Sequence, residues 1–150
     1  MKKALMSIVV LLASATFAFA LDGKVTQVID GDSVEVNGRQ VRVWGIDAPE
    51  YDQPQGQAAK EFATPLLAGK QVHVVEKTTD RYGRLVGEIK IGGHDYGTIL
   101  IQEGLAWWYV KYAPSATHLA QAEREARNAR KGIWASGNPT PPWEWRKMKR

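Results

Sequence analysis

The 150-residue sequence contains no cysteine and only three histidines. The lack of cysteine excludes disulfides, thiolate zinc sites, haem attachment through cysteine and cysteine nucleophiles. His73, His94 and His118 show neither H-x-H nor H-E-x-x-H spacing. We therefore expect no metal-binding or catalytic role for them, which disfavours zinc phosphodiesterase chemistry. Neither sign of charge is in strong excess, since the formal net charge is +4. Any affinity for a polyanion must come from local clusters of charge.

The first twenty residues have the pattern of a secretory signal. Lys2 and Lys3 precede an apolar run, and Ala18-Phe19-Ala20 fits the small-x-small pattern at a cleavage site. The alternative, a retained membrane anchor, is disfavoured because the strongly apolar run is too short to span a bilayer. We predict cleavage after Ala20, a secreted or periplasmic location and no stable membrane association afterwards. The remaining chain suffices for one compact domain and is expected to be a monomer.

Alternating apolar residues predict five strands, and helical spacing predicts three helices. The expected strands are residues 24–30, 33–36, 39–46, 71–77 and 85–91; the expected helices are 58–67, 97–103 and one after residue 115 that ends at Gly132. Asn37-Gly38 is a strong hairpin signal, because both residues tolerate positive φ. This periodicity by itself indicates the α+β class.

Three short motifs carry most of the chemistry. They are V-I-D-G-D-S-V at 28–34, V-R-V-W-G-I-D-A-P-E at 41–50 and D-R-Y-G-R at 80–84. Asp32, Asp47 and Glu50 are carboxylates at strand ends, able to hold a hard cation. Arg42 and Arg84 can each bind two phosphate oxygens. Taken singly, D-G-D is often only a turn and an Arg–Glu pair a surface ion pair. The complete set predicts cleavage of a phosphodiester.

In this order and spacing, the motifs resemble those of the staphylococcal (micrococcal) nuclease family, the thermonucleases. E-G-L-A-W-W-Y-V-K-Y and N-A-R-K-G-I-W extend the resemblance over about residues 24–136. It implies a five-stranded OB-fold β-barrel with three α-helices. It also implies a calcium-dependent, sugar-nonspecific endonuclease that cleaves DNA and RNA and leaves 3′-phosphate ends.

The resemblance assigns roles residue by residue. It implies that the carboxylates of Asp32 and Asp47 and the backbone carbonyl of Ala48 bind Ca²⁺, with Asp30 as an outer charge. Glu50 would activate the attacking water, and Arg42 and Arg84 would bind the scissile phosphate.

The resemblance also assigns three residues to substrate binding. Arg81 would contact a terminal phosphate of the bound nucleotide. Tyr82 would line the same pocket, and Tyr112 would pack near the base.

Two alternatives to this reading stay open on the sequence alone. The first is an OB module that binds nucleic acid or a protein without cutting. It is disfavoured because Arg42, Glu50 and Arg84 are all present. The second is the same enzyme with another divalent ion.

The nuclease domain is expected to span residues 21–136, followed by a basic tail at 137–150 rich in proline and tryptophan. Three roles are open for the tail: a solvated end, a strap packed on the barrel or an additional contact for nucleic-acid phosphates. The strap is favoured.

Overall fold

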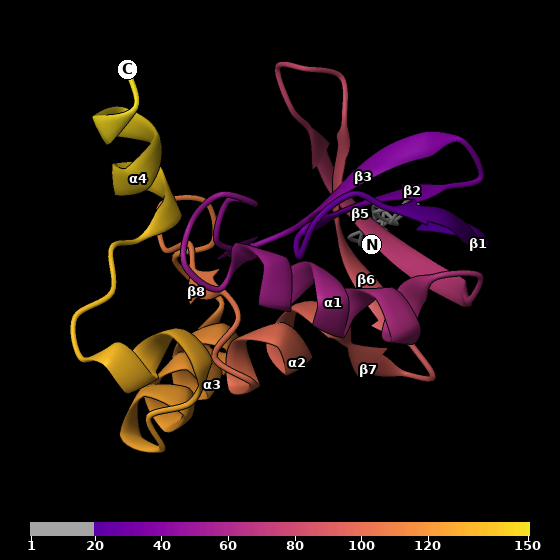
Figure 1. Cartoon of the computed structure of the whole chain (residues 1–150). Helices are drawn as coiled ribbons and strands as arrows, with labels where there is room; N and C mark the ends of the chain where they lie inside the picture. The colour runs from indigo at the N-terminus through magenta and orange to yellow at the C-terminus, as the bar shows by residue number, and fades with distance from the viewer. Residues whose placement is uncertain (1–19) are drawn as a thin grey trace, which may run out of the picture.

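The computed structural model describes residues 20–150 of the chain (Figure 1). The predicted signal segment therefore lies outside the described residues, except for Ala20 at its end. Across residues 20–150, none of the helices combines the length and the apolar character needed to cross a bilayer.

The centre of the molecule is a closed β-barrel. Its strands are β1 (Ala20–Val28), β2 (Ser33–Val36), β3 (Arg39–Val43), β5 (Gln71–Thr79) and β6 (Leu85–Ile91). They follow the order β3-β2-β1-β5-β6, and a parallel pairing of β3 with β6 closes the sheet on itself. The predicted five-stranded OB-type barrel and α+β class are confirmed.

The barrel strands coincide with segments in which apolar and polar residues alternate. Val34, Val36, Val41 and Val43 are at most 1 % exposed and line the interior. The hairpin between β2 and β3 turns at Asn37 and Gly38, with φ of 49° and 81°. Burial of these valines fixes the register, because a slip by one residue would turn them towards solvent.

The third predicted strand is shorter than expected. It ends at Val43, and Ile46–Asp47 forms a separate short strand, β4, paired with β8 (Trp107–Trp108). The break lies at Gly45, whose φ of 77° is incompatible with a continuous strand. A further short strand, β7 (His94–Asp95), pairs with β6.

The three predicted helices are present. They are α1 (Gly56–Leu67), α2 (Tyr96–Gln102) and α3 (Thr117–Asn128), followed by the 3₁₀ helix η1 (Gly132–Ser136). The first two, α1 and α2, pack on the barrel, and α3 packs on α2. Ala59, Ala63 and Leu67 of α1 are fully buried. Pro65 lies in the last turn of α1 without ending it.

The tail forms an additional short helix, α4 (Pro142–Met148). Figure 1 shows it in yellow, apart from α1, α2 and α3. The Gln53 side-chain amide donates a hydrogen bond of 2.6 Å to the carbonyl of Thr140, which joins the tail to the loop before α1. The tail is therefore packed on the body as a strap, as favoured from the sequence.

Candidate active site

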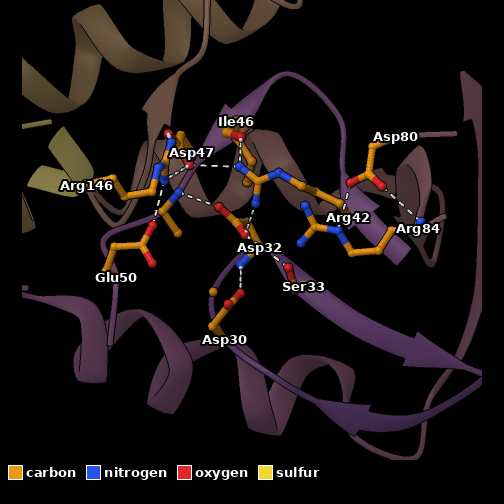
Figure 2. A network of polar contacts seen from close by, with 12 residues as sticks. Asp30, Asp32, Ser33, Arg42, Ile46, Asp47, Glu50, Asp80, Arg84 and Arg146 are labelled. Atoms are coloured by element: carbon orange, nitrogen blue, oxygen red, sulfur yellow. Dashed lines mark hydrogen bonds and ion pairs between the residues drawn. The ribbon is translucent and has the colours of Figure 1, made fainter. Parts of the chain in front are cut away.

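The central feature of the site is one guanidinium shared by two buried carboxylates (Figure 2). Arg42 lies on β3 and pairs in register with Ser33, so Asp32 is brought beside it. Its Nη1 donates to Asp32 Oδ1, and its Nη2 donates to Asp47 Oδ1 at 2.8 Å. Asp32 and Asp47 are 3 % and 1 % exposed. Such charges are tolerated inside a protein only when they are paired and hydrogen-bonded.

Backbone groups fix the Asp30–Asp32 turn. The Ala48 N–H donates to Asp32 Oδ2 at 2.6 Å, and the Asp32 N–H donates to Asp30 Oδ1 at 3.0 Å. The buried hydroxyl of Tyr96 donates to the carbonyl of Gly31 at 2.7 Å. Asp30 and Ala48 thus each form a hydrogen bond with Asp32, and their predicted roles stay predictions.

Burial and charge set the ionisation of the cluster. Burial, together with the neighbouring Asp32, raises the pKa of Asp30 to about 7. Burial also raises the pKa of Asp47, against the opposing hydrogen bond from Arg146. Burial disfavours the charge of Arg42, but Asp32 and Asp47 outweigh it and hold the pKa of Arg42 above its ordinary value. Arg42 is thus a permanent cation within the cluster.

Arg84 is the last residue of the turn that joins β5 to β6. The parallel pairing of Arg42 with Val86 brings this turn beside β3. Asp80 accepts hydrogen bonds from Arg84 Nε at 2.8 Å, from the Arg84 N–H at 3.0 Å and from the Tyr82 N–H at 2.9 Å. Figure 2 shows the Arg84 side chain directed back towards the region of Arg42. The terminal nitrogens of Arg84 are thereby aimed at the site.

Glu50 lies on the loop that leaves β4. Its N–H donates to Gln53 Oε1 at 3.1 Å, and its side chain is 39 % exposed. The structure therefore brings Asp30, Asp32, Arg42, Asp47, Ala48, Glu50 and Arg84 together, and the roles assigned to them stay predictions.

Arg146 is a site residue that was not predicted from the sequence. Its Nη1 donates to Glu50 Oε1 at 2.6 Å and to Asp47 Oδ1 at 3.2 Å, and its Nη2 donates to Asp47 Oδ2 at 2.8 Å. The hydrogen bonds and charges of Asp47 and Glu50 hold the pKa of Arg146 above its ordinary value, although burial opposes this. The basic tail was the available signal, but it does not distinguish Arg146 from its basic neighbours.

The predicted substrate residues lie further out. Arg81 and Tyr82 lie in the turn between β5 and β6, where Arg81 Nη2 donates to the Tyr82 hydroxyl at 2.7 Å. Tyr82 and Tyr112 are 69 % and 62 % exposed. Tyr112 packs edge-on against Tyr109, with ring centroids 4.8 Å apart. All three residues are accessible, and their contact with substrate stays a prediction.

The donor set suits a hard divalent cation. In the part of the chain that the structure describes, no group of three or more His, Cys, Asp or Glu side chains is arranged to hold a metal ion. The predicted set does not require one, because it combines two carboxylates with the Ala48 carbonyl. Oxygen donors of this kind are preferred by Ca²⁺ and Mg²⁺ over softer metals. Asp32 and Asp47 thus fit the predicted ion in chemical character.

The barrel and its cluster of arginines and carboxylates define an OB-fold protein with a charged site beside the barrel. The family model described as "Staphylococcal nuclease homologue" matches residues 40–136. The chain belongs to the staphylococcal nuclease family, and the predicted resemblance is confirmed. The matched residues include Arg42, Asp47, Glu50 and Arg84, whereas α4 lies beyond them.

Individual relatives differ in how much of their length the chain covers. It is 36 % identical over 159 residues to a micrococcal nuclease of Shigella flexneri, covering 97 % of this chain and 91 % of the relative. It is 46 % identical over 111 residues to the staphylococcal-like nuclease CAN1 of Arabidopsis thaliana, covering 74 % of this chain and 34 % of the relative. A probable staphylococcal-like nuclease CAN1 of rice (Oryza sativa subsp. japonica) is 40 % identical over 120 residues, or 80 % of this chain. The chain spans about a third of the length of these plant relatives.

Proposed function

We propose that this protein is an exported, calcium-dependent, sugar-nonspecific endonuclease that hydrolyses DNA and RNA and leaves 3′-phosphate ends. Membership of the nuclease family supports the reaction class. The observation that carries the proposal is the Arg42 guanidinium shared by Asp32 and Asp47, with Glu50 on the adjoining loop. Export rests on the predicted signal segment.

The arginines are suited to the charge that develops at phosphorus. Attack by water on a phosphodiester builds negative charge on the non-bridging oxygens. Preorganised cations stabilise that charge more than solvent does. Arg42 is fixed by two carboxylates and Arg84 by Asp80, so neither needs to be ordered during the reaction. Arginine also forks to two oxygens, which lysine does not.

Glu50 is the proposed general base. Its side chain is more exposed than those of Asp32 and Asp47, so water can reach it. In the proposed step the water oxygen bonds to phosphorus, Glu50 accepts a water proton and the bond from phosphorus to O5′ breaks. O5′ takes up a proton from solvent as it leaves, and the proton on Glu50 then passes to solvent, which gives a 5′-hydroxyl and a 3′-phosphate.

Asp32, Asp47 and the Ala48 carbonyl would hold the cation. When bound, Ca²⁺ supplies charge neutralisation at the phosphate and makes a bound water more acidic. With only two protein carboxylates, we expect weak affinity, on the order of 10⁻⁴–10⁻³ M.

Accessible aromatic residues support broad substrate use. Tyr82 and Tyr112 can stack on bases, and Arg81 beside Tyr82 can contact a phosphate. Stacking contributes about 1–3 kcal/mol per base and tolerates any base, so we expect little sequence preference.

Degradation of single-stranded DNA tests the proposal. The wild type should cut in millimolar calcium and stop in EGTA, and its fragments should be extended by a polymerase only after phosphatase treatment. Glu50→Ala and Arg84→Ala should lose activity, for Arg84→Ala by about 10³-fold or more. Arg39→Ala is the matched control, because Arg39 is exposed and lies outside the cluster. Binding of DNA without cutting in any divalent ion would instead identify a binding module.

A further inference from the structure

Helix α4 brings a third arginine onto the carboxylates that the proposed enzyme needs. Arg146 donates to both oxygens of Asp47 and to Glu50 Oε1, as Figure 2 shows. The helix that carries it lies outside residues 40–136, which the family model matches. The contact is therefore made by a residue beyond the matched part of the chain.

The carboxylate oxygens at this point are already engaged. Asp47 Oδ1 accepts from Arg42 and Arg146, and Asp47 Oδ2 accepts from Arg146. Asp32 Oδ1 accepts from Arg42, and its Oδ2 accepts from the Ala48 N–H. A cation at Asp47 would face a permanent positive charge on the same oxygens, at a position that is 1 % exposed to water.

Besides the ion pairs of Arg146, α4 is held by Trp143, which packs against the buried cluster that contains Trp107 and Trp134, and by surface contacts. Trp143 stacks on Tyr109, with ring centroids 5.0 Å apart and an interplanar angle of 10°. Lys149 and the Trp145 indole N–H both contact the carboxylate of Asp52. Within α4 only Pro142 is buried. Elements with few buried apolar residues open at low free-energy cost, so α4 can separate while the barrel stays folded.

We propose that α4 is an autoinhibitory strap: Arg146 and the catalytic cation bind the Asp47–Glu50 pair alternately. This inference rests on the proposed function, because it assumes a cation at Asp47. With the strap in place, Glu50 is paired and Asp47 is neutralised, so the enzyme is inactive. Cation binding releases Arg146 and frees Glu50 for water. The apparent cation affinity is reduced by the fraction of molecules in which α4 is attached.

Calcium affinity measured by titration calorimetry on the full chain tests the competition. Arg146→Ala should bind calcium at least about 5-fold more tightly than the wild type, within the usual range of coupling between sites. Lys147→Ala is the matched control, because Lys147 lies on the same helix and pairs with Glu144. It should leave the affinity unchanged.

A second variant separates release of the strap from simple removal of charge. Trp143→Ala keeps Arg146 but removes the stack on Tyr109, so it should also tighten calcium binding. Calcium should in addition accelerate amide hydrogen exchange in α4 of the wild type, where the N–H groups of Glu144 and Trp145 donate to the Pro141 carbonyl. Thermal melting of each variant checks that the barrel remains folded.

Three outcomes would contradict the proposal that α4 is autoinhibitory. Weaker calcium binding by Arg146→Ala would show that Arg146 holds the carboxylates in place for the cation. Tighter binding by Arg146→Ala with unchanged binding by Trp143→Ala, and no change in exchange at α4, would show a fixed charge and no release. If no variant bound calcium, the cation site of the proposed function would fail, and the competition with it.

Discussion

Asp80 holds Arg84 at two points, accepting one hydrogen bond from its backbone N–H and one from its side-chain Nε. The first closes the turn and the second fixes the direction of the guanidinium. In the proposed function, the terminal nitrogens of Arg84 would then bind a phosphate.

Asp80→Ala should therefore lower activity, although we assign Asp80 only the positioning of Arg84. Loss of both hydrogen bonds frees the Arg84 side chain, and misplacement of a catalytic group by about 1 Å can cost about 10²-fold in rate. Steady-state kinetics on single-stranded DNA should show the loss mainly in kcat. Glu125→Ala, at an exposed acid on α3, is the control and should keep the wild-type rate. A fully active Asp80→Ala would contradict the positioning role.

Arg42 should be essential for stability as well as for activity. Arg42→Ala leaves Asp32 and Asp47 buried without their shared cation, and breaking a buried pair in this way costs about 3–5 kcal/mol. Denaturant unfolding measures the loss in free energy of unfolding.

Arg39→Ala on the same strand is the matched comparison for Arg42→Ala. Arg39 pairs with Glu76 at 3.5 Å, and its side chain is 46 % exposed. Such surface pairs contribute about 0–1 kcal/mol. Equal losses in the free energy of unfolding in the two variants would show that breaking the buried ion pairs of Arg42 costs no more than breaking a surface pair.

Glu88 lies away from the site. We expect it to make the free energy of unfolding depend on pH in the acid range. Partial burial opposes its charge, but hydrogen bonds from Lys77 and Lys90, at 2.8 and 2.9 Å, outweigh this and lower the pKa of Glu88. Because the unfolded chain then binds more protons, this stabilisation is present above the ordinary pKa and is lost as pH falls through the lowered one.

Glu88→Gln should consequently flatten the acid limb of the stability curve. Unfolding followed between about pH 6 and pH 3 should show a smaller decrease in the free energy of unfolding than in the wild type. When Lys77 and Lys90 are both replaced by Ala, Glu88→Gln should change the pH dependence of the free energy of unfolding less. An unchanged slope in the Glu88→Gln single variant would contradict the assignment.

Much of the site could be predicted because its parts are close along the chain. Asp32, Arg42 and Asp47 belong to one hairpin and the short strand after it. Valine alternation and the Asn37-Gly38 turn set the register of that hairpin from local information. Arg84 is more distant, yet its turn and the family motif both indicated it.

Other features depended on contacts between distant segments. The parallel pairing of β3 with β6 decides where Arg84 meets Arg42, and no local pattern records that pairing. The break of the predicted third strand at Gly45 accompanies the pairing of Ile46 with Trp108, which lies far along the chain.

The sequence by itself thus indicated the barrel strands, apart from the break at Gly45, as well as the family and the site residues between Asp30 and Arg84. Local alternation and turn chemistry suffice for these. Only the tertiary structure decided that Arg146 lies on Asp47 and Glu50, about a hundred residues earlier in the chain. A run of basic residues has no periodicity that selects one member. The choice follows from stacking of Trp143 on Tyr109 and from the buried negative charge that α4 meets there.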